Sequence, residues 1–239
     1  GWFRQVHVKS TDCRRWRSLL VSRRTILNQM RSIENVVRAI LREDGLKLGT
    51  PTRAGFAPKV REMAEHRPAI LSLVEPLLAV LATMAKEFAV LTRRVVDVVR
   101  NEPVCRRLMQ VPGVGPLTAL AFRATIDRPE RFRHSRDVGA HLGLTPSRYQ
   151  SGETDIQGHI SRCGDEIART ALYEAANVLL VRSKKWSSLR AWGLAVAKRR
   201  GMARARVAVA RKLAVILHRM WRDGTDFYFG SNKKEAIAA

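Results

Sequence analysis

The chain has 239 residues, enough for one or two domains with a sizeable core, and its 46% hydrophobic content is that of an ordinary globular protein. Its 44 Lys and Arg residues stand against 21 Asp and Glu residues, a formal net charge of +23 that indicates a nucleic-acid partner. Arginine is much the more frequent cation, and its guanidinium suits bidentate contacts with phosphate. A solvated basic surface is the alternative explanation of the charge.

Several other classes are disfavoured. The three cysteines, Cys13, Cys105 and Cys163, are widely spaced, and no Cys/His spacing suggests a zinc site. No uninterrupted apolar run reaches the roughly 18 residues of a membrane helix, and no signal-peptide pattern is present. We therefore expect a cytoplasmic protein without a membrane partner.

The chain starts with Gly, and its first ten residues alternate Phe3, Val6 and Val8, which predicts a short strand. From Thr11 to Asp44 a helical pattern follows, with Thr11 or Asp12 as the N-cap and Gly45 closing the end. Its heptad seam is Ile26, Met30, Ile33, Val37 and Ile40.

Residues 45–67 carry two prolines and Gly55 and are interpreted as a linker. A second heptad seam follows, ending before Pro103, and Pro76 either opens this helix or kinks it. The seam is Leu77, Leu81, Met84, Phe88, Leu91, Val95 and Val98. Residues 11–102 are therefore predicted to form a helical hairpin or a dimerising coiled coil, and a monomeric bundle with the same stripe stays open.

The stretch from Cys105 to Phe122, "CRRLMQVPGVGPLTALAF", predicts a short helix, a tight turn and a second helix, which is the helix-hairpin-helix pattern. Gly113, Val114 and Gly115 would present backbone N–H groups to a phosphate at the N-terminus of the second helix. The alternative is a structural turn between packed helices.

Two further helices are predicted at 137–142 and 165–181. From Arg182 to Arg222 there are 13 Lys or Arg and no acidic residue, and a heptad seam leaves the cations on the outer faces, as a strip that tracks phosphates. The strip includes Lys198, Arg199, Arg200 and Arg204. We expect its tryptophans to pack in the core, in preference to stacking on bases.

The segment from Gly143 to Asp165, "GLTPSRYQSGETDIQGHISRCGD", is a polar loop that contains Ser151 and Gly152. A serine hydroxyl that attacks a phosphate must be exposed and must have cations nearby, and Arg148, Arg162 and Arg169 are candidates. Other hydroxyls compete for the same role, namely Ser147, Thr154 and Ser161.

Three stretches, "VPGVGPLTALAF", "FRHSRDVGAHLGLTPSRYQSGE" and "GHISRCGDEIARTALYEAAN", resemble in order the C-terminal transposase domain of the insertion-sequence-110 family. That family includes pilin-inverting recombinases and RNA-guided bridge recombinases. The resemblance covers residues 104–182 in detail. The opening "GWFRQVHVKS" and the heptad helices resemble the segment that leaves the family's RuvC-like domain and enters its coiled coil.

The resemblance implies a two-part active site. An N-terminal RNase-H-like domain holds four acidic residues that bind Mg²⁺, and the C-terminal domain supplies the serine of a Ser-Gly motif, which becomes linked to DNA as a phosphoserine. By position that serine is Ser151, followed by Gly152. The acids of this chain do not match the quartet, so no metal ligands are expected in it and Mg²⁺ is expected at the upstream domain.

The resemblance therefore leads us to expect a mainly α fold: residues 1–10 as the tail of the RNase-H-like domain, 11–102 as the coiled coil, and 103–239 as the transposase domain, with a β-hairpin within residues 144–160. DNA is the expected partner in the bacterial nucleoid, with oligomers formed through the coiled coil and a guide RNA as an open question. We expect a recombinase fragment that binds nucleic acid but does not complete strand transfer alone. The alternatives are a non-catalytic helix-hairpin-helix module that binds DNA or RNA, and a degenerate transposase remnant.

Overall fold

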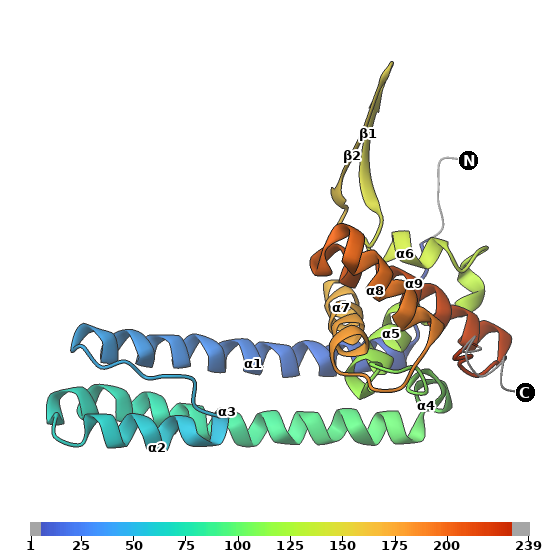
Figure 1. The fold of residues 1–239 in the computed structure, drawn as a ribbon. Coiled ribbons are helices and arrows are strands. Elements are labelled where there is room, and N and C mark those ends of the chain that lie inside the picture. Colours follow the sequence, from blue (N-terminus) through green and yellow to red (C-terminus); the bar gives the residue numbers. More distant parts are fainter. Residues whose placement is uncertain (1–5, 231–239) are drawn as a thin grey trace, which may run out of the picture. The chain divides into compact units, whose positions relative to one another are not determined.

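The computed structural model describes residues 6–230, which form nine α-helices, one 3-10 helix and a two-stranded sheet (Figure 1). The mainly α fold expected from the sequence is confirmed. The chain divides into two units. The hairpin unit is Val21–Arg94, and the C-terminal unit contains the described residues 6–20 and 95–230.

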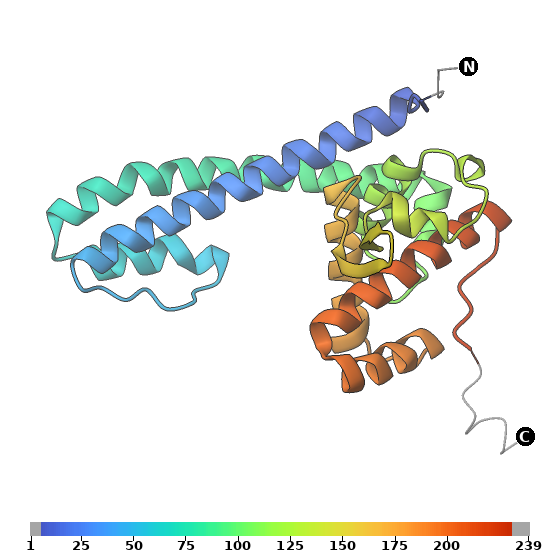
Figure 2. The same cartoon turned by 90° about the horizontal axis from the view of Figure 1, so that it is seen from above.

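The hairpin unit consists of α1 (Thr11–Glu43) from Val21 onward, α2 (Arg53–Ala64), and α3 (Pro68–Asn101) up to Arg94. Within this unit α1 and α3 run side by side and α2 lies along them (Figures 1 and 2). Their shared core contains the buried residues Met30, Val37, Leu41, Phe56, Val60, Ala64, Ile70, Val74, Leu78 and Leu81. The two predicted seams therefore find partners inside one chain, and association with a second chain stays a prediction.

The interpretation of residues 45–67 as a linker was wrong for its second half, because α2 lies there. Thr52 caps this helix by accepting a hydrogen bond from the Gly55 N–H (3.2 Å), and Phe56, Val60 and Ala64 form its buried face. In the sequence, Gly55 and Pro58 obscured the four-residue spacing of these apolar residues.

The predicted start of α1 at Thr11 and its predicted end are confirmed, but its predicted N-cap is wrong by one residue. Gly45 has φ of 74°, its N–H donates to Arg42 O (2.9 Å), and the Leu46 N–H donates to Leu41 O (2.8 Å), which is a Schellman motif. At the start, Ser10 Oγ accepts from the Cys13 N–H (3.3 Å), so Ser10 and not Thr11 or Asp12 is the cap.

Among the described helices α3 is long and apolar enough to cross a membrane, with a window of mean hydropathy 1.8 of which 22% is buried. Length and composition alone do not separate such a helix from a core helix of a soluble protein. Pro76 lies inside α3 and does not open it. One face of α3 is occupied by the core shared with α1 and α2.

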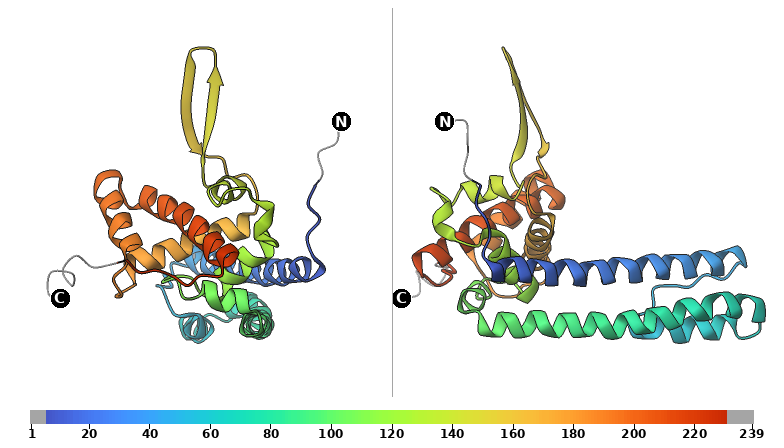
Figure 3. Two further views of the ribbon diagram at one scale, coloured as in Figure 1. Left: turned by 90° about the vertical axis from the view of Figure 1, so that its right-hand side faces the viewer. Right: turned by 180° about the vertical axis from the view of Figure 1, so that it is seen from behind.

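The C-terminal unit is helical apart from one β-hairpin. It contains α4 (Pro103–Leu108), α5 (Pro116–Ile126), η1 (Pro129–Arg131), α6 (Asp137–His141), α7 (Glu166–Val181), α8 (Ser188–Arg200) and α9 (Met202–Asp223). Helix α9 is central and packs against α4, α6, α7 and α8 (Figure 3). Its buried face includes the predicted seam residues Val209, Leu213 and Met220. The helices predicted at 137–142 and 165–181 are confirmed.

The described start of the chain is not the strand that the alternation predicted. Residues 6–10 have no regular secondary structure, and Phe3 lies outside the described residues. Val6 and Val8 are exposed, whereas the side chains of His7 and Lys9 bond inward to α5 and the residue after it. The inward-facing side chains are the polar ones and not the valines, because the groups that this segment bonds to are themselves polar.

The turn between α4 and α5 packs against α7. Gly113 has φ of 91°, and a Cβ there would collide with the carbonyl oxygen of Ala175. Gly115 has an ordinary negative φ of −97° and open space where a Cβ would lie. The two glycines of the motif therefore have different structural roles.

We expect Gly113→Ala to lower the free energy of unfolding by about 3 kcal/mol, because the new Cβ is both strained and obstructed. The matched Gly115→Ala should cost less than about 1 kcal/mol. Urea denaturation followed by circular dichroism measures both. Equal losses in the two variants would contradict this assignment.

Candidate nucleic-acid interface and serine ribbon

The polar loop forms an antiparallel ribbon of β1 (Pro146–Ser151) and β2 (Thr154–Ile160), joined by a two-residue turn and with a register irregularity near Pro146. The ribbon projects from the C-terminal unit (Figures 1 and 3). Gly152 opens the turn with φ of 54°, a conformation that favours glycine. Ser151 is the last residue of β1, pairs with Thr154 and is exposed. The hairpin expected within residues 144–160 is therefore confirmed.

The hydroxyls of the ribbon differ in what they contact. Ser147 Oγ donates to the carbonyl oxygen of His159 at 3.0 Å, so it is engaged within the ribbon. The Ser151 hydroxyl makes no hydrogen bond to any group that the structure describes. Side chains alternate along a strand, so Ser151 shares a face with Tyr149, whose cross-strand partner is Ile156. Tyr149 is 67% and Ile156 58% exposed, which leaves an apolar patch beside Ser151.

The base of the ribbon is fixed to the C-terminal unit through residues 142–145 and 161–165, which we call the ribbon foot. The Ser161 N–H donates to Thr145 O (2.9 Å), and the Arg162 N–H donates to Gly143 O (3.2 Å). Gly143 and Gly164 both have positive φ, and a Cβ on either would collide with backbone across the foot. The direction of the ribbon is therefore set by close backbone contacts.

Asp165 connects the foot to two helices. Its carboxylate caps α7 by accepting from the N–H groups of Ile167 (2.9 Å) and Ala168 (3.1 Å). It also forms an ion pair with Arg17 of α1, which belongs to the C-terminal unit at that point. This carboxylate stabilises the junction between β2 and α7.

The three arginines predicted to surround Ser151 have different environments. Arg148 forms a two-pronged ion pair with Asp155 across the ribbon, with Nε to Oδ1 at 2.7 Å. Arg169 Nη1 donates to the carbonyl oxygens of Leu142 (3.2 Å) and Cys163 (2.9 Å), inside the foot. Arg162 is exposed at the foot with φ of 55°. The ribbon itself carries Arg148 against two acids, so its cations do not gather at the tip.

The predicted basic strip lies where α8 meets α9. Lys198, Arg199 and Arg200 form the last turn of α8, and Arg204 lies in the first turn of α9; all four are exposed. Cations in the last turn of a helix also interact favourably with its dipole. Trp192 and Trp221 pack partly buried against the core, whereas Trp186 is 37% exposed.

The predicted phosphate-binding turn is half-buried on α7. Val114 is 5% exposed and its N–H donates to Val111 O (3.0 Å). Its side chain therefore belongs to the core, and a phosphate at this turn would be held by the N–H groups of its neighbours. Gly115 stands at the N-cap of α5, with the dipole of that helix behind it.

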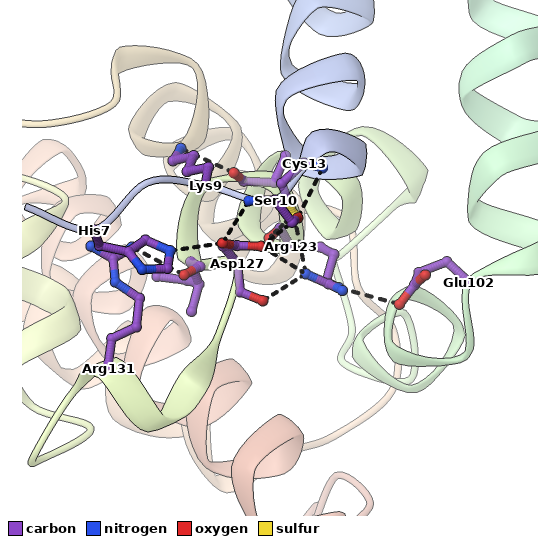
Figure 4. Close-up of polar contacts among 10 residues, drawn as sticks. His7, Lys9, Ser10, Cys13, Glu102, Arg123, Asp127 and Arg131 are labelled. Carbon is purple, nitrogen blue, oxygen red and sulfur yellow. Dashed lines mark hydrogen bonds and ion pairs between the residues drawn. The ribbon is translucent and has the colours of Figure 1, made fainter.

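A polar cluster holds the described start of the chain against α5 (Figure 4). Asp127 is 5% exposed, and its carboxylate accepts from the Ser10 N–H (3.0 Å) and Ser10 Oγ (2.7 Å) and lies 2.7 Å from His7 Nε2. Lys9 Nζ donates to Ala124 O at 3.0 Å. Arg123 Nη1 donates to the Asp127 carbonyl oxygen at 2.8 Å. We call these contacts the N-terminal clip.

The electrostatics of the clip favour an ionised carboxylate. Burial acts to raise the pKa of Asp127, but hydrogen bonds from Ser10, Cys13 and His7 outweigh burial and hold that pKa below its usual range. Arg123 also pairs with Glu102 (Nε to Oε1, 3.2 Å) and lies over the rings of Trp16 and Trp221. The hydrogen-bonding partners of the Asp127 carboxylate are therefore all supplied within the clip, which holds this carboxylate away from solvent.

Cysteine and metal chemistry find little support in the described part of the chain. The Cys13 and Cys105 thiols are buried, and burial raises the pKa of Cys105 to about 12, so this thiol stays protonated. Within residues 6–230 no three His, Cys, Asp or Glu side chains lie close enough together to hold a metal ion. The resemblance places its Mg²⁺ site in the upstream domain, so it assigns no metal ligand to these residues.

Comparison with known proteins agrees with the sequence motifs. Residues 105–191 match the model of the transposase IS116/IS110/IS902 family. The chain is 28% identical over 219 residues to the transposase for insertion sequence element IS1111A of Coxiella burnetii, covering 90% of this chain and 60% of that protein. It is 30% identical over 220 residues to a probable family 20 transposase of Pseudomonas aeruginosa, covering 90% and 65% respectively.

Within a helical, strongly basic unit, these matches define a domain of the insertion-sequence transposase class. Through the domain formed by residues 105–191, the chain belongs to the IS116/IS110/IS902 family of transposases. The chain spans about 60% of the length of the Coxiella relative and 59% of a putative transposase of Sinorhizobium fredii.

Two structurally important residues were not found from the sequence. Asp127 follows an apolar helix like any exposed loop acid, and its partners His7 and Ser10 lie more than a hundred residues away in the sequence. His218 interrupts the apolar face of α9 yet is fully buried. A polar residue at a core-facing helical position was a usable signal for His218, and none existed for Asp127.

We expect Asp127→Asn to lower the free energy of unfolding at pH 7 by about 2–3 kcal/mol, because the buried donors lose a charged acceptor. The folded pKa is depressed, so the contribution of this carboxylate is present above its unfolded pKa of about 4 and is lost as the pH falls further. The difference from wild type should shrink on acidification. Denaturation at pH 7, 5 and 3 measures it, with exposed Asp12→Asn as the control.

Proposed function

We propose that this chain is the DNA-binding and serine-bearing part of an insertion-sequence transposase, with Ser151 as the nucleophile of strand cleavage. The single observation that carries the proposal is the position of Ser151, exposed beside Gly152 at the tip of a ribbon with a rigid foot. Family membership supports DNA as the substrate. We place the protein at the bacterial nucleoid on the same grounds.

The proposed reaction is a transesterification at phosphorus. The Ser151 oxygen forms a bond to phosphorus while one P–O bond of the DNA backbone breaks, and the released sugar hydroxyl takes up a proton in place of the one that leaves Ser151. The number of phosphoester bonds is unchanged, so no energy source is required. A phosphoserine intermediate keeps the cut end attached until a second DNA hydroxyl attacks it.

Other parts of the proposal extend beyond the described residues. In the resembled family, the acidic quartet and the Mg²⁺ that this chemistry uses belong to an upstream domain. This chain spans 60% of the length of the Coxiella relative, and we propose that such a domain acts together with it. We propose that the hairpin unit assembles chains into oligomers. A guide RNA in the complex is part of the same hypothesis.

A non-catalytic nucleic-acid-binding module is the second candidate. The observation that favours it is the charge of the ribbon, in which Arg148 is paired with Asp155 and a second acid, Glu153, lies in the turn. An exposed ion pair contributes little to stability, and Arg148 can exchange Asp155 for a phosphate. The pairing is therefore compatible with both functions.

Covalent trapping separates the two candidates. The chain is mixed with a suicide DNA substrate and Mg²⁺, with and without a separately supplied upstream acidic domain of the resembled family. We expect a DNA-linked band on a denaturing gel when the upstream part is present, and its loss of at least about 1,000-fold in Ser151→Ala. Ser147→Ala, on the same ribbon face, is the matched control and should keep the band. An adduct that survives Ser151→Ala would overturn the assignment, and salt-sensitive binding without any adduct would favour the module.

A further inference from the structure

The segment between α5 and α6 is an arginine-rich loop to which no function is assigned above. Residues 128–137 read "RPERFRHSRD" and contain four arginines against two acids. Arg128, Arg133 and Arg136 are exposed. Of the described residues only Asp137 approaches one of these three closely enough for an ion pair, with Arg136 Nε at 4.0 Å.

This loop is held at both ends by one buried histidine. His218 of α9 is fully buried, with Nε2 2.9 Å from the carbonyl oxygen of Pro129 and Nδ1 2.9 Å from Ser135 Oγ. Burial lowers the pKa of His218, so the ring is neutral. A carbonyl only accepts, so Nε2–H donates to Pro129 and Nδ1 accepts from Ser135.

Arg131, the fourth arginine of the segment, and the ring of Phe132 contribute to the structure of the loop. Arg131 Nη1 donates to Ile126 O (3.1 Å), and its guanidinium lies over the Phe132 ring. Phe132 in turn packs edge-on against the rings of His141 and His218. The loop is thus pinned from inside while its other arginines face solvent.

A further arginine reaches this surface from α9. The aliphatic stem of Arg211 lies over Gly139 of α6, where a Cβ would come within 3.1 Å of its Cγ. Gly139 therefore gives Arg211 its place over α6. We call Arg128, Arg133, Arg136 and Arg211 the α6 arginine surface.

This surface lies at the base of the ribbon. Helix α6 ends at His141, and the Leu144 N–H donates to Gly139 O at 2.9 Å as the chain enters the foot. Figure 3 shows α6 below the ribbon. Six residues of extended chain span about 20 Å, which is less than one turn of duplex DNA, about 34 Å. A duplex bound at the base can therefore also reach the tip.

We propose that the α6 arginine surface binds the phosphate backbone of duplex nucleic acid and supplies the positive charge that the ribbon lacks. The pinned backbone keeps these arginines together on one surface, and guanidinium groups suit phosphate oxygens. Backbone contacts fix the register of a duplex without reading its sequence. The inference deepens the proposed function, because it concerns the DNA presented to Ser151, yet it requires no covalent step.

The test is the salt dependence of binding by fluorescence anisotropy. The probe is a labelled 30-base-pair DNA duplex, with an RNA duplex of the same sequence as a second arm. The variant Arg128→Gln/Arg133→Gln/Arg136→Gln keeps Arg131 and Arg211, which pack on the fold. The control, Arg31→Gln/Arg93→Gln/Arg94→Gln, removes the same charge from exposed positions of the hairpin unit.

We expect the loop variant to bind DNA roughly tenfold or more weakly at 0.1 M salt, with a slope of log K against log salt that is smaller by about 2.7, or about 0.9 for each lost phosphate contact. The control should lose much less affinity, and its slope should change much less. An equal loss on the RNA arm would extend the assignment to any duplex backbone. Slopes that match between loop variant and control on both arms would overturn the proposal. The adduct assay reports on Ser151 independently, so either proposal can fail alone.

Discussion

The backbone contacts at the ribbon foot are the constraint on which the site depends. A two-stranded ribbon is only marginally stable alone, so its direction must be set where it joins the helices. Gly143 and Gly164 allow that close approach, and Arg169 holds two carbonyl oxygens there. Because the foot is fixed between α6 and α7, the exposed Ser151 has a defined position relative to the basic surfaces of the same unit.

The structure separates the hydroxyl from the positive charge. The ribbon has more acids than cations, whereas exposed cations lie at its foot, on the loop before α6 and where α8 meets α9. Under the proposed function, a backbone held elsewhere on the unit would determine which phosphate Ser151 meets, because the tip has no cation cluster of its own. The exposed Tyr149–Ile156 pair beside it gives the tip an apolar face.

Helices with a periodic apolar face could be predicted from the sequence, because burial of one face dominates their stability: α1, α3, α7 and α9 lie where the periodicity places them. Helix α2 could not, since Pro58 and Gly55 mask its spacing, and neither could the N-terminal clip, whose partners are distant in sequence. Ser151 was chosen as the candidate nucleophile through the family resemblance, whereas the pairing of Arg148 with Asp155 follows from strand register, which one sequence does not reveal.

The most direct test of the central claim is to locate the DNA attachment on the protein. A trapped adduct, formed in the presence of a separately supplied upstream acidic domain of the resembled family, is digested with nuclease and protease and sequenced by tandem mass spectrometry. The account predicts a nucleotide phosphate on Ser151 within the ribbon peptide. Attachment at Ser147, Tyr149, Thr154 or any residue outside the ribbon would contradict it.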